Sequence, residues 1–135
     1  MSLFDNFNVA GSAMNAQSLR LNLVASNMAN ADTITQNPDE AYRARHPVFQ
    51  QVLQDADNQA TGVRMVAVVE NQSPIPVRHQ PGHPLADENG NIYSSNVNMV
   101  EQMVDMISAS RSYQSNVEVF NTSKQLLLQT LRLGS

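Results

Sequence analysis

The sequence predicts a mainly α-helical fold of the α+β class, with two long terminal helices paired as a coiled coil and short strands between them. Apolar residues recur every seven positions near both ends of the chain, which predicts the two helices. A middle segment rich in proline and β-branched residues predicts strands and turns. The expected organisation is an N-terminal helix region at 1–33, a loop and small β insert at 34–95, and a C-terminal helix region at 96–135.

The first helix is expected to run from Phe4 or Phe7 to about Ala31, with Asp5 as its N-cap. Gly11 weakens such a helix by about 1 kcal/mol relative to alanine. Small residues permit close approach of another backbone; they are Gly11, Ser12, Ala13, Ala16, Ala25 and Ala29. One apolar seam is expected along this helix. One position of the seven-residue repeat holds Phe7, Met14, Leu21 and Met28. The second position that completes the seam, here called the partner position, holds Ala10, Gln17, Val24 and Ala31.

The second helix is expected to begin near Ser95 or Asn96, either of which could cap it, and to end at about Leu131. It carries a longer seam and, beside it, a second apolar strip over its first turns. The seam consists of Met99, Met106, Tyr113, Phe120 and Leu127 with the partner position Met103, Ser110, Val117, Lys124 and Leu131; the strip consists of Val97, Val100, Val104 and Ile107. A helix with two apolar faces is typical of a packed layer.

The middle of the chain predicts a small β element. Part of Tyr42–Val52 reads as strand, and Val63–Glu70 is the strongest strand candidate after a polar loop at Asp55–Gly62. Four prolines keep Ser73–Pro84 extended or turning. The pair Asn89-Gly90 predicts a tight hairpin turn. Such a short sheet is too small to be very stable alone.

Composition excludes several functions. The net charge of −4 has the wrong sign for a nucleic-acid binder, and the absence of cysteine excludes disulfides and thiolate catalysis. The N-terminus has the pattern of neither a Sec-type signal peptide nor a membrane span.

Fifteen asparagines and twelve glutamines make up a fifth of the chain, and Arg20 is the one charged residue between Phe7 and Ala31. A free two-stranded coiled coil normally carries Glu and Lys beside its seam. Amide-rich flanks suit close lateral packing, because amides both donate and accept hydrogen bonds. A polar, solvated helix face is the alternative interpretation.

The sequence gives little support for a catalytic or metal site. Prolines prevent His79 and His83 from sharing a helix face, and nothing orders them with Asp87 and Glu88 as metal ligands. We interpret these histidines as loop residues in contact with solvent or a neighbour. No nucleophile elbow, no partner for His46 and no phosphate-binding loop is visible, so neither an enzyme nor a cofactor is expected.

A methionine cluster in the second helix, Met99, Met103 and Met106, allows two interpretations. Such a stripe fills irregular gaps in a core, and it also suits contact with several non-identical neighbours.

Two terminal segments resemble the family of flagellar rod and hook proteins. Arg20–Thr33 (RLNLVASNMANADT) is similar to the N-terminal motif of that family, and Val97–Val119, followed by Asn121-Thr122 and Leu126–Gly134, is similar to its C-terminal motif. Pro81–Asp87 and Tyr42–Arg45 further resemble proximal-rod members of the flagellar basal body.

Two departures from the family pattern lie near the end of the first helix. Ala41 stands where relatives often have glycine, and the stretch Ile34–Glu40 is individual to this chain.

The resemblance implies a non-enzymatic subunit of a helical tube that crosses the periplasm and transmits torque. It implies export through the flagellar type III apparatus, without a cleaved signal peptide and without direct membrane insertion. It also implies other rod proteins and copies of the chain itself as neighbours. Asn27 and Asn30 become structural amides at a helix end, and Ser108–Tyr113 part of a helix-packing surface.

Assembly and export together imply terminal helices, at 1–31 and 97–135, that are marginally stable in the monomer, because polar helices bury little surface alone. A soluble helical adaptor or export chaperone is the alternative function. It explains the methionine stripe but not the weakly charged flanks of both helices.

Overall fold

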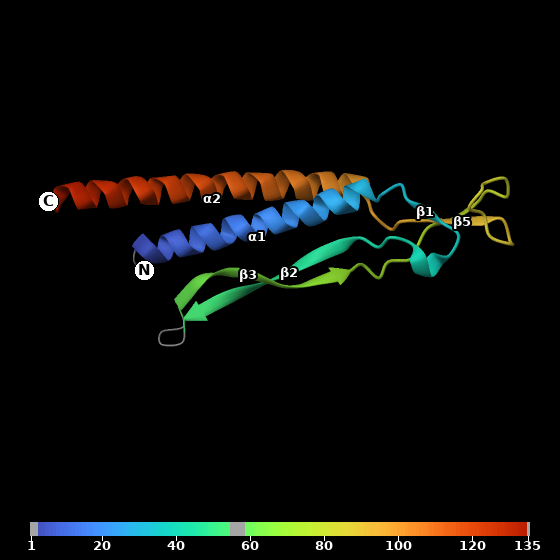
Figure 1. The fold of residues 1–135 in the computed structure, drawn as a ribbon, viewed down its shortest axis with the longest axis horizontal. Helices are drawn as coiled ribbons and strands as arrows, with labels where there is room; N and C mark the ends of the chain where they lie inside the picture. Colours follow the sequence, from blue (N-terminus) through green and yellow to red (C-terminus); the bar gives the residue numbers. More distant parts are fainter. Residues whose placement is uncertain (1–2, 55–58, 135) are drawn as a thin grey trace. The chain divides into compact units, whose positions relative to one another are not determined.

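The computed structural model describes residues 3–54 and 59–134. Two long helices, α1 (Leu3–Ala29) and α2 (Met99–Leu133), are separated in the chain by strands, two of which are longer than the predicted short strands, at 10 and 12 residues (Figure 1). The predicted α+β class is therefore confirmed, and both helices have nearly the predicted bounds.

Two compact units divide the chain. The first unit contains the described residues of Met1–Leu21, Pro47–Ala67 and Ile107–Ser135, and the second contains Asn22–His46 and Val68–Met106. Each long helix contributes one part to each unit.

The helix caps differ from the predicted ones. Since α1 begins at Leu3, Asp5 lies inside its first turn, where a negative charge favours the positive end of the helix dipole. The cap of α2 is Asn98, whose Oδ1 accepts from the N–H groups of Val100 (3.1 Å) and Glu101 (3.3 Å). The predicted caps Ser95 and Asn96 precede it and bond elsewhere.

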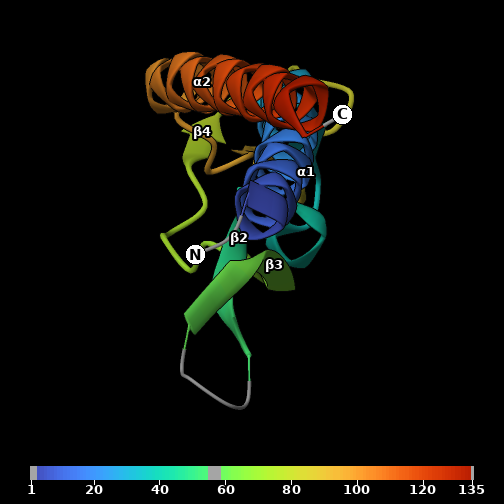
Figure 2. The same cartoon turned by 90° about the vertical axis from the view of Figure 1, so that its left-hand side faces the viewer.

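In the first unit, α1 lies between α2 and a two-stranded sheet of β2 (Arg45–Gln54) and β3 (Gln59–Glu70), as both views show (Figures 1 and 2). The rings of Phe7 and Phe120 meet edge to face, with their centroids 5.0 Å apart and their planes at 78°. This aromatic pair joins the two helices in this unit.

Ser12 joins α1 to β3. Its hydroxyl donates to the carbonyl of Val9 (2.9 Å) and accepts from the N–H of Val63 (3.0 Å). Gly62 is buried beside it, and a Cβ at that position would stand 2.6 Å from the Oγ of Ser12. The absence of a side chain at Gly62 therefore permits the close approach of strand to helix.

The second unit contains an antiparallel sheet in the order β1 (Ile34–Thr35), β5 (Asn91–Ser94), β4 (Val77–His79). Ile92, in the central strand, is among the most buried side chains that the structure describes. A 3₁₀ helix, η1 (Pro38–Glu40), follows β1, and the side chain of Asn37 caps it.

The predicted hairpin turn is partly wrong. Gly90 has a φ of 79°, as a glycine after asparagine in a turn requires. A local turn is present, since the N–H of Asp87 donates to the carbonyl of Asn91 (2.9 Å), but the ladder partner of β5 is β4, across the loop at 80–90. The N–H of Gln80 donates to the carbonyl of Gly90 (2.9 Å) and closes that loop.

The predicted strands at Tyr42–Val52 and Val63–Glu70 correspond to β2 and β3. Of the predicted polar loop Asp55–Gly62, residues 55–58 lie outside the described residues, and β3 begins at Gln59.

Replacing Gly62 should disturb the contact between β3 and α1. We expect Gly62→Ala to destabilise the chain by about 1–3 kcal/mol, because the added methyl overpacks the site beside Ser12. Gly82→Ala is the matched control, since a Cβ there meets no atom within 4 Å. Urea unfolding of both variants and exchange of the Val63 amide proton measure the effect. Equal stability of the two variants would contradict the assigned contact.

Candidate assembly interface

The side chain of Asn27, on α1, makes four hydrogen bonds in the second unit and is fully buried. Its Nδ2 donates to the carbonyl of Arg45 (2.9 Å) and to Oε1 of Gln102 (3.0 Å). Its Oδ1 accepts from the hydroxyl of Tyr42 (2.8 Å) and from the N–H of Arg45 (2.9 Å). These bonds use the full donor and acceptor capacity of one amide. Asn27 therefore ties α1 to α2 and to the start of β2.

Neighbouring side chains contact two hydrogen-bond partners of Asn27, namely Arg45 and Tyr42. The Arg45 guanidinium lies over the ring of Tyr42, 5.5 Å from its centroid, a cation–π arrangement. The hydroxyl groups of Ser26 and Tyr42 are 3.2 Å apart and share a hydrogen bond. The side chain of Asn30 makes fewer hydrogen bonds than that of Asn27: among the bonds described, its Nδ2 donates only to the carbonyl of Ser26 (2.8 Å).

A second amide, Asn96, joins three chain segments just before α2. Its Oδ1 accepts from the N–H of Ala44 (2.7 Å), and its Nδ2 donates to the carbonyls of Asn71 (3.0 Å) and Ser73 (3.1 Å). Nη1 of Arg43 donates to the same two carbonyls. Asn96 was predicted as a possible cap of the second helix. It instead links the segment just before α2 to the chain at Ala44 and at Asn71 and Ser73.

The most buried positions of α2 lie one residue before the predicted partner position. Gln102, Ala109 and Ser123 are buried, and Asn116, seven residues from Ala109 and Ser123, is half-buried. Within the chain itself, the predicted partner position is more exposed than this neighbouring position. Prediction followed the large apolar side chains, whereas close packing places small or hydrogen-bonded side chains at the tightest positions.

The predicted interface residues fall into three groups by exposure. Met103 is 48% exposed and Leu131 is 62% exposed. The others are buried (Val24 and Asn27) or half-buried (Phe7, Met14, Leu21, Met28, Asn30, Met99, Met106, Tyr113, Val117, Phe120 and Leu127). Their contact with a neighbouring subunit stays a prediction.

Sequence reasoning did not single out Gln102 or Tyr42, although both hold Asn27. A seven-residue recurrence of small and amide residues from Gln102 to Ser123 was the available signal.

Two apolar surfaces of α2 face outward. At its start, Val100 (70% exposed), Met103 and Val104 are spaced as one helix face, and two of them, Val100 and Val104, belong to the predicted second strip. At its end, Leu126, Leu128, Leu131 and Leu133 are exposed. Exposed apolar surface of this kind marks interaction sites.

Within the described residues, neither long helix combines the length and hydropathy needed to cross a bilayer.

The loop at 80–90 is organised by Asp87. Its Oδ1 accepts from the N–H groups of Asn91 (2.8 Å) and Asn89 (2.9 Å), and its Oδ2 from the hydroxyl of Tyr93 (3.2 Å). The Asn91 N–H lowers the pKa of this carboxyl most, and the Tyr93 hydroxyl adds to that effect. Burial, followed by the bond to Asp87, raises the pKa of Tyr93. The carboxylate acts here as a structural acceptor.

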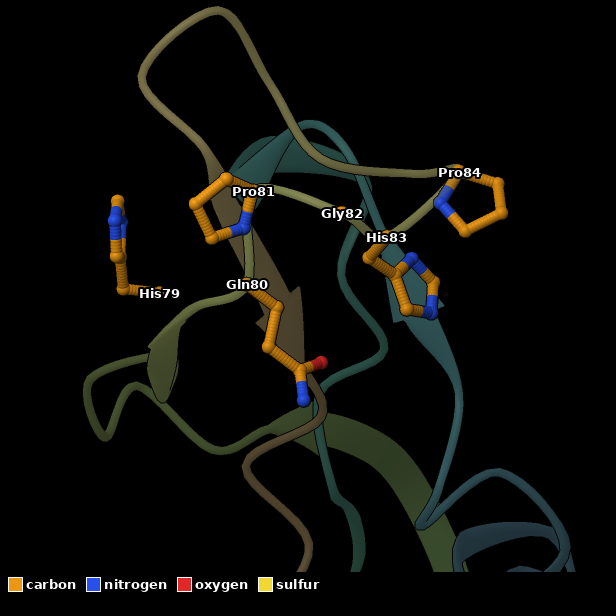
Figure 3. Close-up of a pocket in the computed structure, with 6 residues that line it drawn as sticks. All are labelled: His79, Gln80, Pro81, Gly82, His83 and Pro84. Carbon is orange, nitrogen blue, oxygen red and sulfur yellow. The ribbon is translucent and has the colours of Figure 1, made fainter.

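A cavity of about 490 Å³ lies beside this loop, lined by His79, Gln80, Pro81, Gly82, His83 and Pro84 (Figure 3). The rings of His79 and His83 stand on opposite sides of Gln80 (Figure 3). Nδ1 of His79 bonds to Oδ1 of Asn91, and Nδ1 of His83 accepts from the N–H of Leu85. Over 3–54 and 59–134, no three histidine or acidic side chains cluster as metal ligands.

Family models match both ends of the chain. Residues 7–34 match the model described as flagella basal body rod protein, and residues 88–133 match the C-terminal model of flagellar basal body rod FlgEFG proteins. The chain is 50% identical to the flagellar basal-body rod protein FlgC of Salmonella typhimurium over 135 residues, covering 99% of each chain. It is 50% identical to FlgC of Yersinia enterocolitica and 44% identical to a Buchnera aphidicola FlgC, again over 99% of each chain.

Removing the Asn27 amide should destabilise the second unit. We expect Asn27→Ala to lower the free energy of unfolding by roughly 2–4 kcal/mol, because it removes the partner of the buried Oε1 of Gln102 and of part-buried backbone groups of Arg45. Urea unfolding followed by circular dichroism measures the change.

Asn30→Ala is the matched control, because it removes one bond to Ser26 at a half-buried site. We expect it to cost less than about 1 kcal/mol. If the two variants were equally stable, the central role of Asn27 would be wrong.

Proposed function

Because the chain belongs to the family of flagellar basal-body rod proteins, we propose that it assembles helically through its paired terminal helices and transmits torque across the periplasm. It is a structural rod subunit of the flagellar basal body. The observation that carries the proposal is the outward-facing apolar surface of α2, at both ends of that helix.

Two contacts support coiled-coil pairing of the terminal helices. Phe7 meets Phe120 in the first unit, and Asn27 bonds to Gln102 in the second. The spacing of Gln102, Ala109 and Ser123 by multiples of seven residues adds to this support, because such spacing keeps one side of a helix against a partner.

The exposed side chains of α2 support contacts between subunits. Val100, Met103 and Val104 are exposed, and covering them removes apolar surface from water. Obligate interfaces typically bury more than about 2,000 Å². Contacts between unlike surfaces propagate as an open helical filament when the rotation does not close into a ring. The expected neighbours are therefore other rod proteins and further copies of this chain.

The exposure of distal α2 supports transport in an unfolded state. Beyond Ala109, Ser123 is the one buried residue among the described residues of that helix. A helix that buries so little gains stability on assembly, as export through the type III apparatus requires. Passage through that apparatus without a cleaved signal peptide is part of the proposal and rests on the family.

Trypsin should cleave the purified monomer at Lys124 before it cleaves at Arg45. Lys124 is exposed on distal α2, whereas the backbone N–H and carbonyl of Arg45 are both bonded to Asn27. Mass spectrometry of timed digests, together with far-UV circular dichroism, measures the order of cleavage and the helix content. A highly helical monomer that resists cleavage equally at both sites would contradict marginal stability of the distal helix.

Acidic substitutions in the seam should stop motility without stopping export. We expect Phe120→Asp or Leu21→Asp to abolish swimming, because each places a charge at a half-buried packing position. Soft-agar swimming and immunodetection of exported protein provide the two readouts.

Gln114→Asp is the matched control, since Gln114 is exposed on the same helix as Phe120. It should swim normally. Normal swimming of the seam variants would overturn their packing role.

A further inference from the structure

Asn89 is the one asparagine of the chain that a glycine follows. Each of the others precedes a residue that carries a Cβ. A side chain on the following residue hinders the approach of its backbone nitrogen to the asparagine carboxamide, whereas Gly90 has no Cβ. Asn89 is exposed, and its side chain takes part in none of the hydrogen bonds that the structure describes. The Asn89 carboxamide is therefore available for a reaction with the chain itself.

That reaction is an intramolecular displacement. The backbone nitrogen of Gly90 attacks Cγ of Asn89, a new C–N bond closes a succinimide ring, and the C–N bond of the side-chain amide breaks. The proton lost by the Gly90 nitrogen leaves with the amide nitrogen as ammonia. Water then opens the ring at either of its carbonyls, which yields aspartate or isoaspartate. The two reacting groups are neighbours in the chain, so no second molecule except water is needed.

The folded loop around Asp87 keeps the two groups from reacting. The N–H of Gly90 donates to the carbonyl of Asp87 (3.0 Å), and the N–H of Asn89 donates to Oδ1 of Asp87 (2.9 Å). Gly90 is also buried, and a Cβ at that position would lie 3.0 Å from Cε1 of His79. The Gly90 nitrogen must leave this bond and this packing before it attacks, so the loop has to open first.

We propose that Asn89 is a site of spontaneous deamidation, which the folded loop around Asp87 slows and which the unfolded chain undergoes freely. The sequence supplies the reactive pair of Asn89 and Gly90, and the hydrogen bonds of Asp87 decide how often the pair reacts. The rate of modification therefore reports how often this loop opens. The proposal stands independently of the proposed function.

Conversion to isoaspartate displaces Gly90. The isoaspartyl linkage runs through the side-chain carbon of residue 89 and so lengthens the backbone. Gly90 has little room to move, and its carbonyl accepts from the N–H of Gln80 (2.9 Å) at the end of β4. A longer backbone loses that bond and leaves backbone groups without partners. Isoaspartate therefore keeps the loop open and weakens the pairing of β4 with β5.

Timed incubation of the full-length chain tests the site, in buffer and in guanidinium chloride at the same mildly alkaline pH. Peptide mass spectrometry follows the loss of the Asn89 amide. We expect modification at least about tenfold faster in guanidinium chloride, because the folded loop must open before the Gly90 nitrogen is released. Equal rates would overturn the protection by the loop. No modification of Asn89 in guanidinium chloride, or faster modification of another asparagine, would overturn the site.

Two variants test the role of the Asp87 carboxylate. Asp87→Ala should speed modification of the folded chain at least about fivefold, since it removes the acceptor of the N–H groups of Asn89 and Asn91. Glu88→Ala is the matched control, because it removes the same charge from an exposed neighbour and should keep the original rate.

In guanidinium chloride both variants and the unaltered chain should react within about twofold of one another, because the loop is absent there. Circular dichroism verifies that each variant folds in buffer. Equal rates for the two folded variants would contradict the assignment to Asp87. If Asp87→Ala does not fold, the unaltered chain in the two solvents decides the question alone.

Trypsin measures the structural consequence. Ion-exchange chromatography isolates the isoaspartate form, and timed digestion compares cleavage after Arg78, which pairs with Ile92 in the sheet. We expect this cleavage to be at least about threefold faster than in the unmodified chain, with cleavage after Lys124 unchanged. Asn89→Asp is the matched control, because it carries the added charge on a backbone of normal length. Equally fast cleavage of Asn89→Asp would assign the effect to charge and overturn the displacement of Gly90.

Discussion

The second unit depends on one buried amide. Asn27 bonds to α2 through Gln102 and to the start of β2 through both backbone groups of Arg45. A buried amide with every donor and acceptor satisfied permits one arrangement of its partners, since any shift strands a polar group away from water. Apolar packing is less directional. The amide therefore fixes how the helix ends and the strand meet.

The hydrogen bonds of individual asparagines show what the many amide side chains do in this structure. Asn96 holds three backbone groups before α2, Asn98 caps that helix and Asn37 caps η1. Each of these side chains satisfies backbone groups that regular secondary structure leaves without partners. A chain with few charges and many amides can therefore specify its fold by directional hydrogen bonds.

Some apolar residues of the chain pack against each other within a unit, and others remain exposed. Phe7 and Phe120 meet within the first unit, whereas Val100 and Leu133 remain exposed. A rod subunit needs both kinds of surface, because it must fold as a unit and also cover its neighbours. The weakly buried distal part of α2 is consistent with stability that is completed in the assembly.

Seven-residue periodicity, β-branched runs and proline positions were sufficient to predict α1, α2, β2 and β3, because local spacing sets which face of an element is apolar. The terminal motifs were sufficient to identify the family. Tertiary structure alone decided the phase of the buried side of α2, the pairing of β5 with β4 and the partners of Asn27 and Asn96. Those features join residues far apart in the chain, and an amide side chain looks the same in sequence whether it faces water or completes a buried network.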